Sequence, residues 1–160
     1  MAYWKETQKK ILIWQGGIDL DRINDKGLEN AFRWLTSAEM NYAHGNMDIA
    51  VYSLEMSFEI GMKSLLQKMH SDFPKSHSVG DFFVVYVEKN PQINQETKTS
   101  LLSYLDDFRT LLRLRNVAGY SFENQKELES MGKVYGVTHD SAESFLGYVN
   151  NALKELDKVS

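Results

Sequence analysis

The segment from residue 47 to residue 69 constrains the fold more than any other part of the sequence. One side of it carries apolar or small residues at helical spacing: Leu54, Phe58, Gly61 and Leu65. The opposite side is apolar as well and carries Tyr52, Met56 and Ile60. A helix that is apolar nearly all round is usually buried on several sides, so this segment should lie at the centre of a helical domain. Asn46 stands just before it and can cap its N-terminus.

Three further segments have a clear helical periodicity. Residues 26 to 44 and residues 95 to 117 each predict one continuous amphipathic helix. A last helix should begin at Asp140 or Ser141, either of which can cap it, and end at Leu156.

Other segments are less regular. Residues 2 to 15 predict a short helix that ends at the Gly16–Gly17 pair. The stretch "VGDFFVVYVE" has the β-branched and aromatic residues of a strand, but the chain offers no partner strands, which favours a short helix. Residues 119 to 137 contain three glycines and predict no definite element.

These segments together predict an all-α fold. With only two prolines in 160 residues, little interrupts the helices. We expect an antiparallel up-and-down bundle of four to five helices with short extra helices. It should form a single domain over residues 1–160, in which residues 1–24 are an N-terminal extension and residues 26–156 are the bundle.

Charge and composition limit the classes of function. The net charge is −4, so any RNA contact must come from a local cluster of basic residues. The apolar run "FFVVYV" is far shorter than the roughly 20 residues of a membrane helix, and no signal peptide is visible. We therefore expect a cytoplasmic protein that makes no contact with a membrane.

We expect neither a metal site nor a cofactor. The chain has no cysteine and no HExxH motif, and it has no glycine-rich phosphate loop. We also assign no second ligand at helical metal spacing to any of the four histidines, which are His44, His70, His77 and His139.

Arg115 is the most unusual residue in the predicted 95–117 helix. The core stripe of this helix continues onto Arg115, whereas Arg113 falls on the solvated side. A charge on the core side is costly unless it is paired or opens into a pocket. The simpler interpretation is that the helix frays here and that the guanidinium caps backbone carbonyls.

Glu59 and Lys63 are the second unusual feature, because they lie among apolar residues of the central helix. Glu followed by Lys four residues later is the favourable order for an ion pair. Such a pair within a bundle is more often structural than catalytic.

These pieces, in this order, resemble the HEPN family of small helical-bundle proteins, whose members bind nucleotides or act as ribonucleases. The resemblance covers about residues 26 to 156. The run "AFRWLTSAEMNYAHGNMDIAVYSLEMSFEIGMKSLLQ" is similar to the family's first helix pair, with Glu59 and Lys63 matching its Glu-x-x-x-Lys pattern. "KSHSVGDFF" is similar to the short His-containing segment of many members, and "RNVAGY" is similar to the family's Arg-centred motif.

The resemblance gives Arg115 and its neighbours possible roles. In active members an Arg, often followed by a polar residue such as Asn, is separated by four to six residues from a His in a cleft between two subunits. Arg115 and Asn116 match the first half of this motif, but Tyr120 stands where the His would be. Tyrosine, with an ordinary pKa of about 10, is a poor base at neutral pH, although it can donate a hydrogen bond and stack on a base. Phe122 occupies the place of a tyrosine that a partner nucleotidyltransferase modifies in some toxin members.

The leading hypothesis is a homodimeric binding module that holds a nucleotide or RNA phosphate in the dimer cleft, without efficient catalysis. Arg115 would bind the phosphate, Asn116 would orient it and Tyr120 would form a wall, while Glu59 would pair with Arg115 or Lys63.

Two alternatives remain open. The first is a metal-independent endoribonuclease of toxin type, which would use Tyr120 or His77 to move protons and act with a nucleotidyltransferase-like antitoxin partner. The second is a non-catalytic protein-interaction adaptor, for which we expect a patch of exposed apolar surface. The replacement of the motif His by Tyr120 argues against an enzyme.

Overall fold

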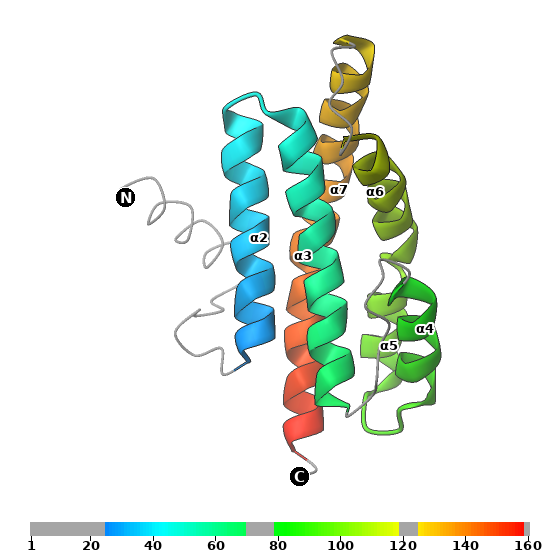
Figure 1. Ribbon diagram of the computed structural model, residues 1–160. Helices are drawn as coiled ribbons and strands as arrows, with labels where there is room; N and C mark the ends of the chain where they lie inside the picture. The colour runs from blue at the N-terminus through cyan, green and yellow to red at the C-terminus, as the bar shows by residue number, and fades with distance from the viewer. Residues whose placement is uncertain (1–24, 70–78, 119–124, 159–160) are drawn as a thin grey trace.

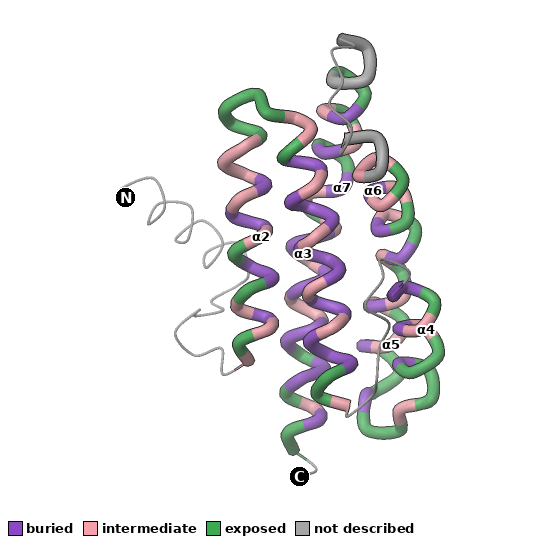
Figure 2. Tube along the Cα trace, in the orientation of Figure 1, coloured by how far each residue is buried: buried purple, intermediate pink, exposed green. Residues whose placement is uncertain are grey.

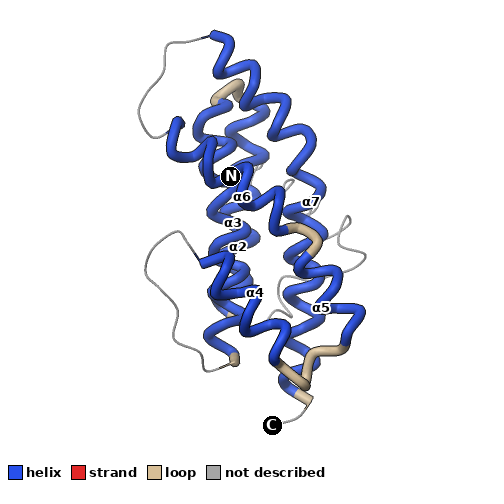
Figure 3. The backbone as a smooth tube through the Cα atoms, turned by 90° about the vertical axis from the view of Figure 1, so that its right-hand side faces the viewer, coloured by secondary structure: helices blue, strands red, loops and turns tan. Residues whose placement is uncertain are grey.

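A computed structural model describes residues 25–69, 79–118 and 125–158 of the chain. Every regular element in this part of the chain is a helix, as the third view shows (Figure 3). In chain order the helices are α2 (Lys26–Ala43), α3 (Met47–Lys68), α4 (Val79–Lys89), α5 (Gln95–Leu102), α6 (Leu105–Ala118) and α7 (Gln125–Asp157). The expectation of an all-α bundle is confirmed.

The long helices alternate in direction. α2 and α3 form an antiparallel hairpin (Figure 1). α5 and α6 then run one after the other in the direction opposite to α3, and α7 reverses the direction again and packs against α3. The tight turn between α2 and α3 contains Gly45, whose φ of 80° lies in the left-handed region that favours glycine.

α3 is the central helix, as its apolar pattern predicts. It packs against α2, α4, α6 and α7, and most of its residues are buried (Figure 2). At Gly61 the backbone of α3 comes so close to α7 that a Cβ atom would lie 2.7 Å from Leu146 Cδ2. A small residue is therefore required at this crossing.

Four phenylalanines from four helices form the middle of the core. The ring centroid of Phe145 on α7 lies 5.0 Å from that of Phe58 on α3 and 5.9 Å from that of Phe83 on α4. Phe58 in turn lies 6.2 Å from Phe108 on α6. All four are fully buried, so this cluster joins α3, α4, α6 and α7.

The segment predicted as one helix from 95 to 117 is two helices, which corrects that expectation. α5 ends at Leu102, and the Ser103 hydroxyl donates to the Ser100 carbonyl oxygen (2.7 Å). After the break the Tyr104 ring lies against Phe145, with the two centroids 6.3 Å apart. The buried stripe continues across the break, which is why the periodicity alone did not show it.

The last helix is much longer than predicted, because α7 begins at Gln125 and not at Asp140 or Ser141. Its buried stripe extends upstream of the predicted start, through Met131 and Tyr135. Two glycines that suggested irregular structure lie within this helix. Each costs about 1 kcal/mol relative to alanine, which burial of the stripe can offset.

Two smaller predictions concern α3 and α4. Asn46 is the N-cap residue of α3, but its side chain does not cap the helix and instead donates to Asn41 Oδ1 (3.3 Å). The "VGDFFVVYVE" segment is indeed helical, as α4. The predicted N-terminal helix over residues 2 to 15 lies outside the described residues.

In the described part of the chain, every helix is too short or too polar to cross a membrane.

Candidate functional site

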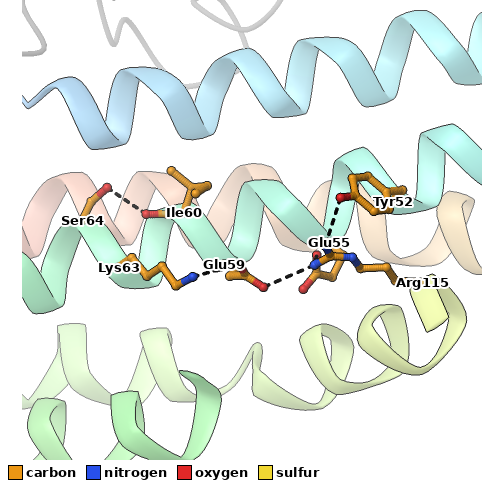
Figure 4. A network of polar contacts seen from close by, with 7 residues as sticks. All are labelled: Tyr52, Glu55, Glu59, Ile60, Lys63, Ser64 and Arg115. Atoms are coloured by element: carbon orange, nitrogen blue, oxygen red, sulfur yellow. Dashed lines mark hydrogen bonds and ion pairs between the residues drawn. The ribbon is translucent and has the colours of Figure 1, made fainter. Parts of the chain in front are cut away.

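Arg115 points from α6 towards α3, where its guanidinium meets two carboxylates and a tyrosine (Figure 4). Nη1 lies 2.8 Å from Glu55 Oε2 and 3.4 Å from Glu59 Oε1. Nη2 donates to the Tyr52 hydroxyl (3.0 Å), and the guanidinium carbon lies 4.3 Å from the centroid of the same ring. Only 10% of the Arg115 side chain is exposed, so these contacts hold a nearly buried cation in place.

The partners of Arg115 come from one side of α3. Tyr52, Glu55, Glu59 and Lys63 follow each other at intervals of three or four residues, which places them along one face of the helix. Lys63 Nζ donates to Glu59 Oε2 (3.0 Å), so Glu59 links the two cations. We call these five residues the Arg115 cluster.

Burial has a strong effect on the acid–base behaviour of Glu55. Its side chain is fully buried, and desolvation together with the charge of Glu59 raises its pKa to about 8, although Arg115 acts in the opposite direction. Glu55 Oε1 accepts no hydrogen bond within the described part of the chain, so a proton on this atom disrupts no contact seen there. Glu55 should therefore be largely protonated at neutral pH.

The Glu55→Gln substitution tests this protonation state through stability. Between pH 4.5 and about 8, Glu55 keeps its proton in the folded chain and loses it on unfolding, so its contribution to stability falls as pH rises. Glutamine resembles the protonated acid and does not titrate. We expect the variant to match the wild type near pH 4.5 and to exceed its free energy of unfolding by about 4–5 kcal/mol near pH 8.5.

Urea unfolding at several pH values measures this difference. Glu143, whose pKa is also raised to about 8, contributes to the slope of both proteins and cancels in the comparison. A constant difference between the two proteins over this pH range would show that Glu55 is ionised in the folded chain.

The structure decides between the two interpretations of Arg115. The cap interpretation is wrong in its main point, because the guanidinium pairs with carboxylates across the core and is not at a frayed, solvated end. The expected contact of Glu59 with Arg115 or Lys63 is present with both residues.

Two members of the Arg115 cluster, Glu55 and Tyr52, were not predicted from the sequence. Glu55 precedes Glu59 by four residues, and this second carboxylate on the same helical face was a signal that could have been used. Tyr52 was counted only as an apolar residue, although a buried tyrosine needs a partner for its hydroxyl.

Comparison with known proteins places these features in a family. A family model of the HEPN domain matches residues 25–159, which is most of the chain. This chain belongs to the HEPN-domain family. No curated protein and no solved structure matches it.

The HEPN match spans both halves of the Arg115 cluster, namely α3 and α6. Asn116 lies in the last turn of α6, but its side chain is not among those described. Tyr120, Phe122 and His77 fall outside the described residues. Their assigned roles therefore stay predictions.

A second polar cluster of this HEPN chain was overlooked in the sequence. His139 and Glu143 stand four residues apart on α7, so the statement that no histidine has a ligand at helical metal spacing was wrong. Glu39 on α2 completes a group whose ligand atoms all lie within 4.8 Å of one another. Burial and the nearby negative charges raise the pKa of the Glu143 carboxyl to about 8.

Proposed function

We propose that this HEPN protein binds the phosphate group of a nucleotide or RNA in a cleft between two copies of the chain, without efficient cleavage. Arg115 is the principal phosphate contact, Asn116 orients the ligand and Tyr120 supplies a hydrogen bond or a stacking surface. The observation that supports this proposal is the Arg115 cluster, which holds an arginine of the family motif in a defined position.

The contacts of Arg115 favour a binding role because they restrict the side chain before any ligand arrives. An arginine loses much of its rotamer freedom when it grips a phosphate, and this loss opposes binding. Here Glu55, Glu59 and Tyr52 already fix the guanidinium, so little further freedom is lost. A pre-positioned guanidinium suits the planar, two-point recognition of phosphate oxygens.

The charge of the Arg115 cluster also favours an anion. With Glu55 protonated, the positive charges of Arg115 and Lys63 exceed the single negative charge of Glu59. The cluster is then locally positive in a chain whose net charge is −4. This is the kind of local basic group that a nucleotide or RNA contact requires here.

The homodimer is part of the proposal. Leu111 on α6 is fully buried within one chain, so it does not contribute to an interface. The support for the dimer is the cleft between subunits in active HEPN members, together with Leu112 and Leu114. These two side chains are only partly buried at the end of α6, and a second copy could cover them.

An RNA-binding assay tests the proposal and separates it from the ribonuclease alternative. We expect the fluorescence anisotropy of a labelled ribo-oligonucleotide to saturate with wild-type protein while a denaturing gel shows the RNA intact. Lys63→Gln removes a positive charge from the Arg115 cluster, where the side chain is 19% exposed, and should weaken binding about tenfold.

Lys89→Gln is the matched control, because it removes the charge of an exposed lysine on α4 and should leave affinity within about twofold. Cleavage that persists after extensive purification and is lost in Arg115→Lys would instead support the toxin-type endoribonuclease, with or without a nucleotidyltransferase-fold partner. Equal losses in the two lysine variants would contradict a site at the Arg115 cluster.

The adaptor alternative receives less support from the described surface. The exposed large apolar side chains of the described residues are Tyr42, Ile49, Val85, Tyr86 and Val137. The Tyr86 ring stacks on Phe82 and the Tyr42 ring stacks on Tyr135, so each of these two rings is partly covered. A few exposed apolar residues are normal on a monomer and do not by themselves indicate the broad patch that an adaptor predicts. We therefore retain phosphate binding as the proposed function.

A further inference from the structure

Three potential metal ligands meet where α2 packs against α7. His139 Nε2 lies 3.0 Å from Glu39 Oε1 on α2 and 3.2 Å from Glu143 Oε1, one turn further along α7. None of the three belongs to the Arg115 cluster. Their side chains are 17% (Glu39), 20% (His139) and 5% (Glu143) exposed, so the group lies largely within the bundle but remains open to small ions.

The distances fit the requirements of a small divalent ion. Zinc lies about 2.0–2.2 Å from nitrogen and oxygen ligands, so two ligand atoms of a tetrahedral site are about 3.3–3.5 Å apart. The two observed distances from Nε2 are within a few tenths of an ångström of this spacing. Since all three ligand atoms lie within 4.8 Å of one another, small side-chain shifts would place them around one ion.

The second ring nitrogen of His139, Nδ1, has a carboxylate neighbour of the kind that metal-binding histidines usually have. Nδ1 lies 3.3 Å from Asp140 Oδ1, a carboxylate that can accept the Nδ1 proton when Nε2 binds a metal ion. The Tyr135 ring lies beside the imidazole, with centroids 5.4 Å apart, and stacks on Tyr42 of α2. These contacts restrict the orientation of the ring.

The chemistry of the group indicates which ions it would take. Two carboxylate oxygens converge on one imidazole nitrogen, so a positive charge between them is favourable, whether it is a proton or a metal ion. An imidazole with two carboxylates suits zinc and related transition metals better than magnesium or calcium, which prefer oxygen ligands alone. Three protein ligands would leave a fourth position for water.

We propose that Glu39, His139 and Glu143 form a binding site for a divalent transition-metal ion of the zinc class, which links α2 to α7. The site is independent of the proposed phosphate binding, because it shares no residue with the Arg115 cluster. A bound ion would hold together two helices that are far apart in sequence and should stabilise the folded chain.

Calorimetric titration of the full chain with zinc chloride, after removal of metal with EDTA and dialysis, tests this site. We expect one zinc ion per chain, a raised melting temperature in the presence of zinc, and no displacement by millimolar magnesium. His139→Gln should weaken zinc binding at least about 100-fold, since even the loss of an outer partner costs 10–100-fold. Asp140→Asn, which alters such an outer partner, should cost about 10-fold.

His44→Gln is the matched control, because it removes an exposed histidine outside the group and should leave zinc affinity within about twofold. If His139→Gln does not fold, Glu39→Gln provides the same test at a residue on the other helix. The proposal is overturned if the wild type shows no saturable binding at one ion per chain. It is also overturned if a folded His139→Gln or Glu39→Gln variant binds zinc as tightly as the wild type.

Discussion

Replacing Arg115 by alanine is expected to lower the free energy of unfolding by about 3 kcal/mol at neutral pH. The substitution leaves Glu55 and Glu59 buried against α6 without the guanidinium that now contacts both of them. Breaking a buried pair by removing one partner costs about 3–5 kcal/mol, because an uncompensated charge remains in the interior. The ability of Glu55 to hold a proton places the expected loss at the lower end of this range.

Urea unfolding followed by circular dichroism measures this loss, and Arg113→Ala is the matched control. Arg113 is exposed on the same helix, and its substitution should change stability by less than about 0.5 kcal/mol. Equal effects of the two substitutions would mean that the Arg115 cluster contributes nothing to the fold.

Phe145→Ala should have an effect of similar size, for a reason unrelated to charge. The Phe145 ring packs against Phe58, Phe83 and Tyr104, so its removal opens a cavity among α3, α4, α7 and the turn that precedes α6. Truncating a fully buried phenylalanine costs about 3–5 kcal/mol, through lost burial and the remaining cavity.

Phe82→Ala, at a partly buried position on α4, is the comparison for this substitution and should cost less than about 2 kcal/mol. Thermal and urea unfolding of both variants provide the measurement. If Phe145→Ala were no more destabilising than Phe82→Ala, the phenylalanine cluster would not be the centre of the core.

The sequence was sufficient to predict most of the fold, because burial in a helical bundle leaves a periodic pattern. The apolar character of α3 on all sides predicted its central position, and the apolar stripe of residues 26 to 44 predicted the amphipathic helix α2. Helix ends were harder to predict. The α5–α6 break at Ser103 depends on a side chain that bonds to a backbone carbonyl, and such a local contact leaves the stripe unchanged. The early start of α7 depends on tertiary burial that overcomes the low helix propensity of glycine.

The candidate site was only partly predictable, for a related reason. Helical geometry predicted that Arg115 continues the core stripe, whereas its contact with Glu59 was expected only within the hypothesis that followed the family resemblance. Which atoms meet across two helices depends on how the helices cross, and one sequence does not contain this crossing explicitly. For that reason Glu55 was missed on α3, and the approach of Glu39 on α2 to His139 on α7 could not be foreseen.

The most direct test of the central claim, that Arg115 binds a phosphate group, is a calorimetric titration of ATP into wild type, Arg115→Lys and Arg113→Lys. Lysine preserves the positive charge between Glu55 and Glu59 but cannot offer two parallel donors to a phosphate. We predict saturable binding by the wild type, at least about tenfold weaker binding by Arg115→Lys, and an affinity within about twofold of the wild type for Arg113→Lys. If the wild type shows no saturable binding, or if both variants bind ATP as the wild type does, the Arg115 cluster serves the fold alone and the claim is wrong.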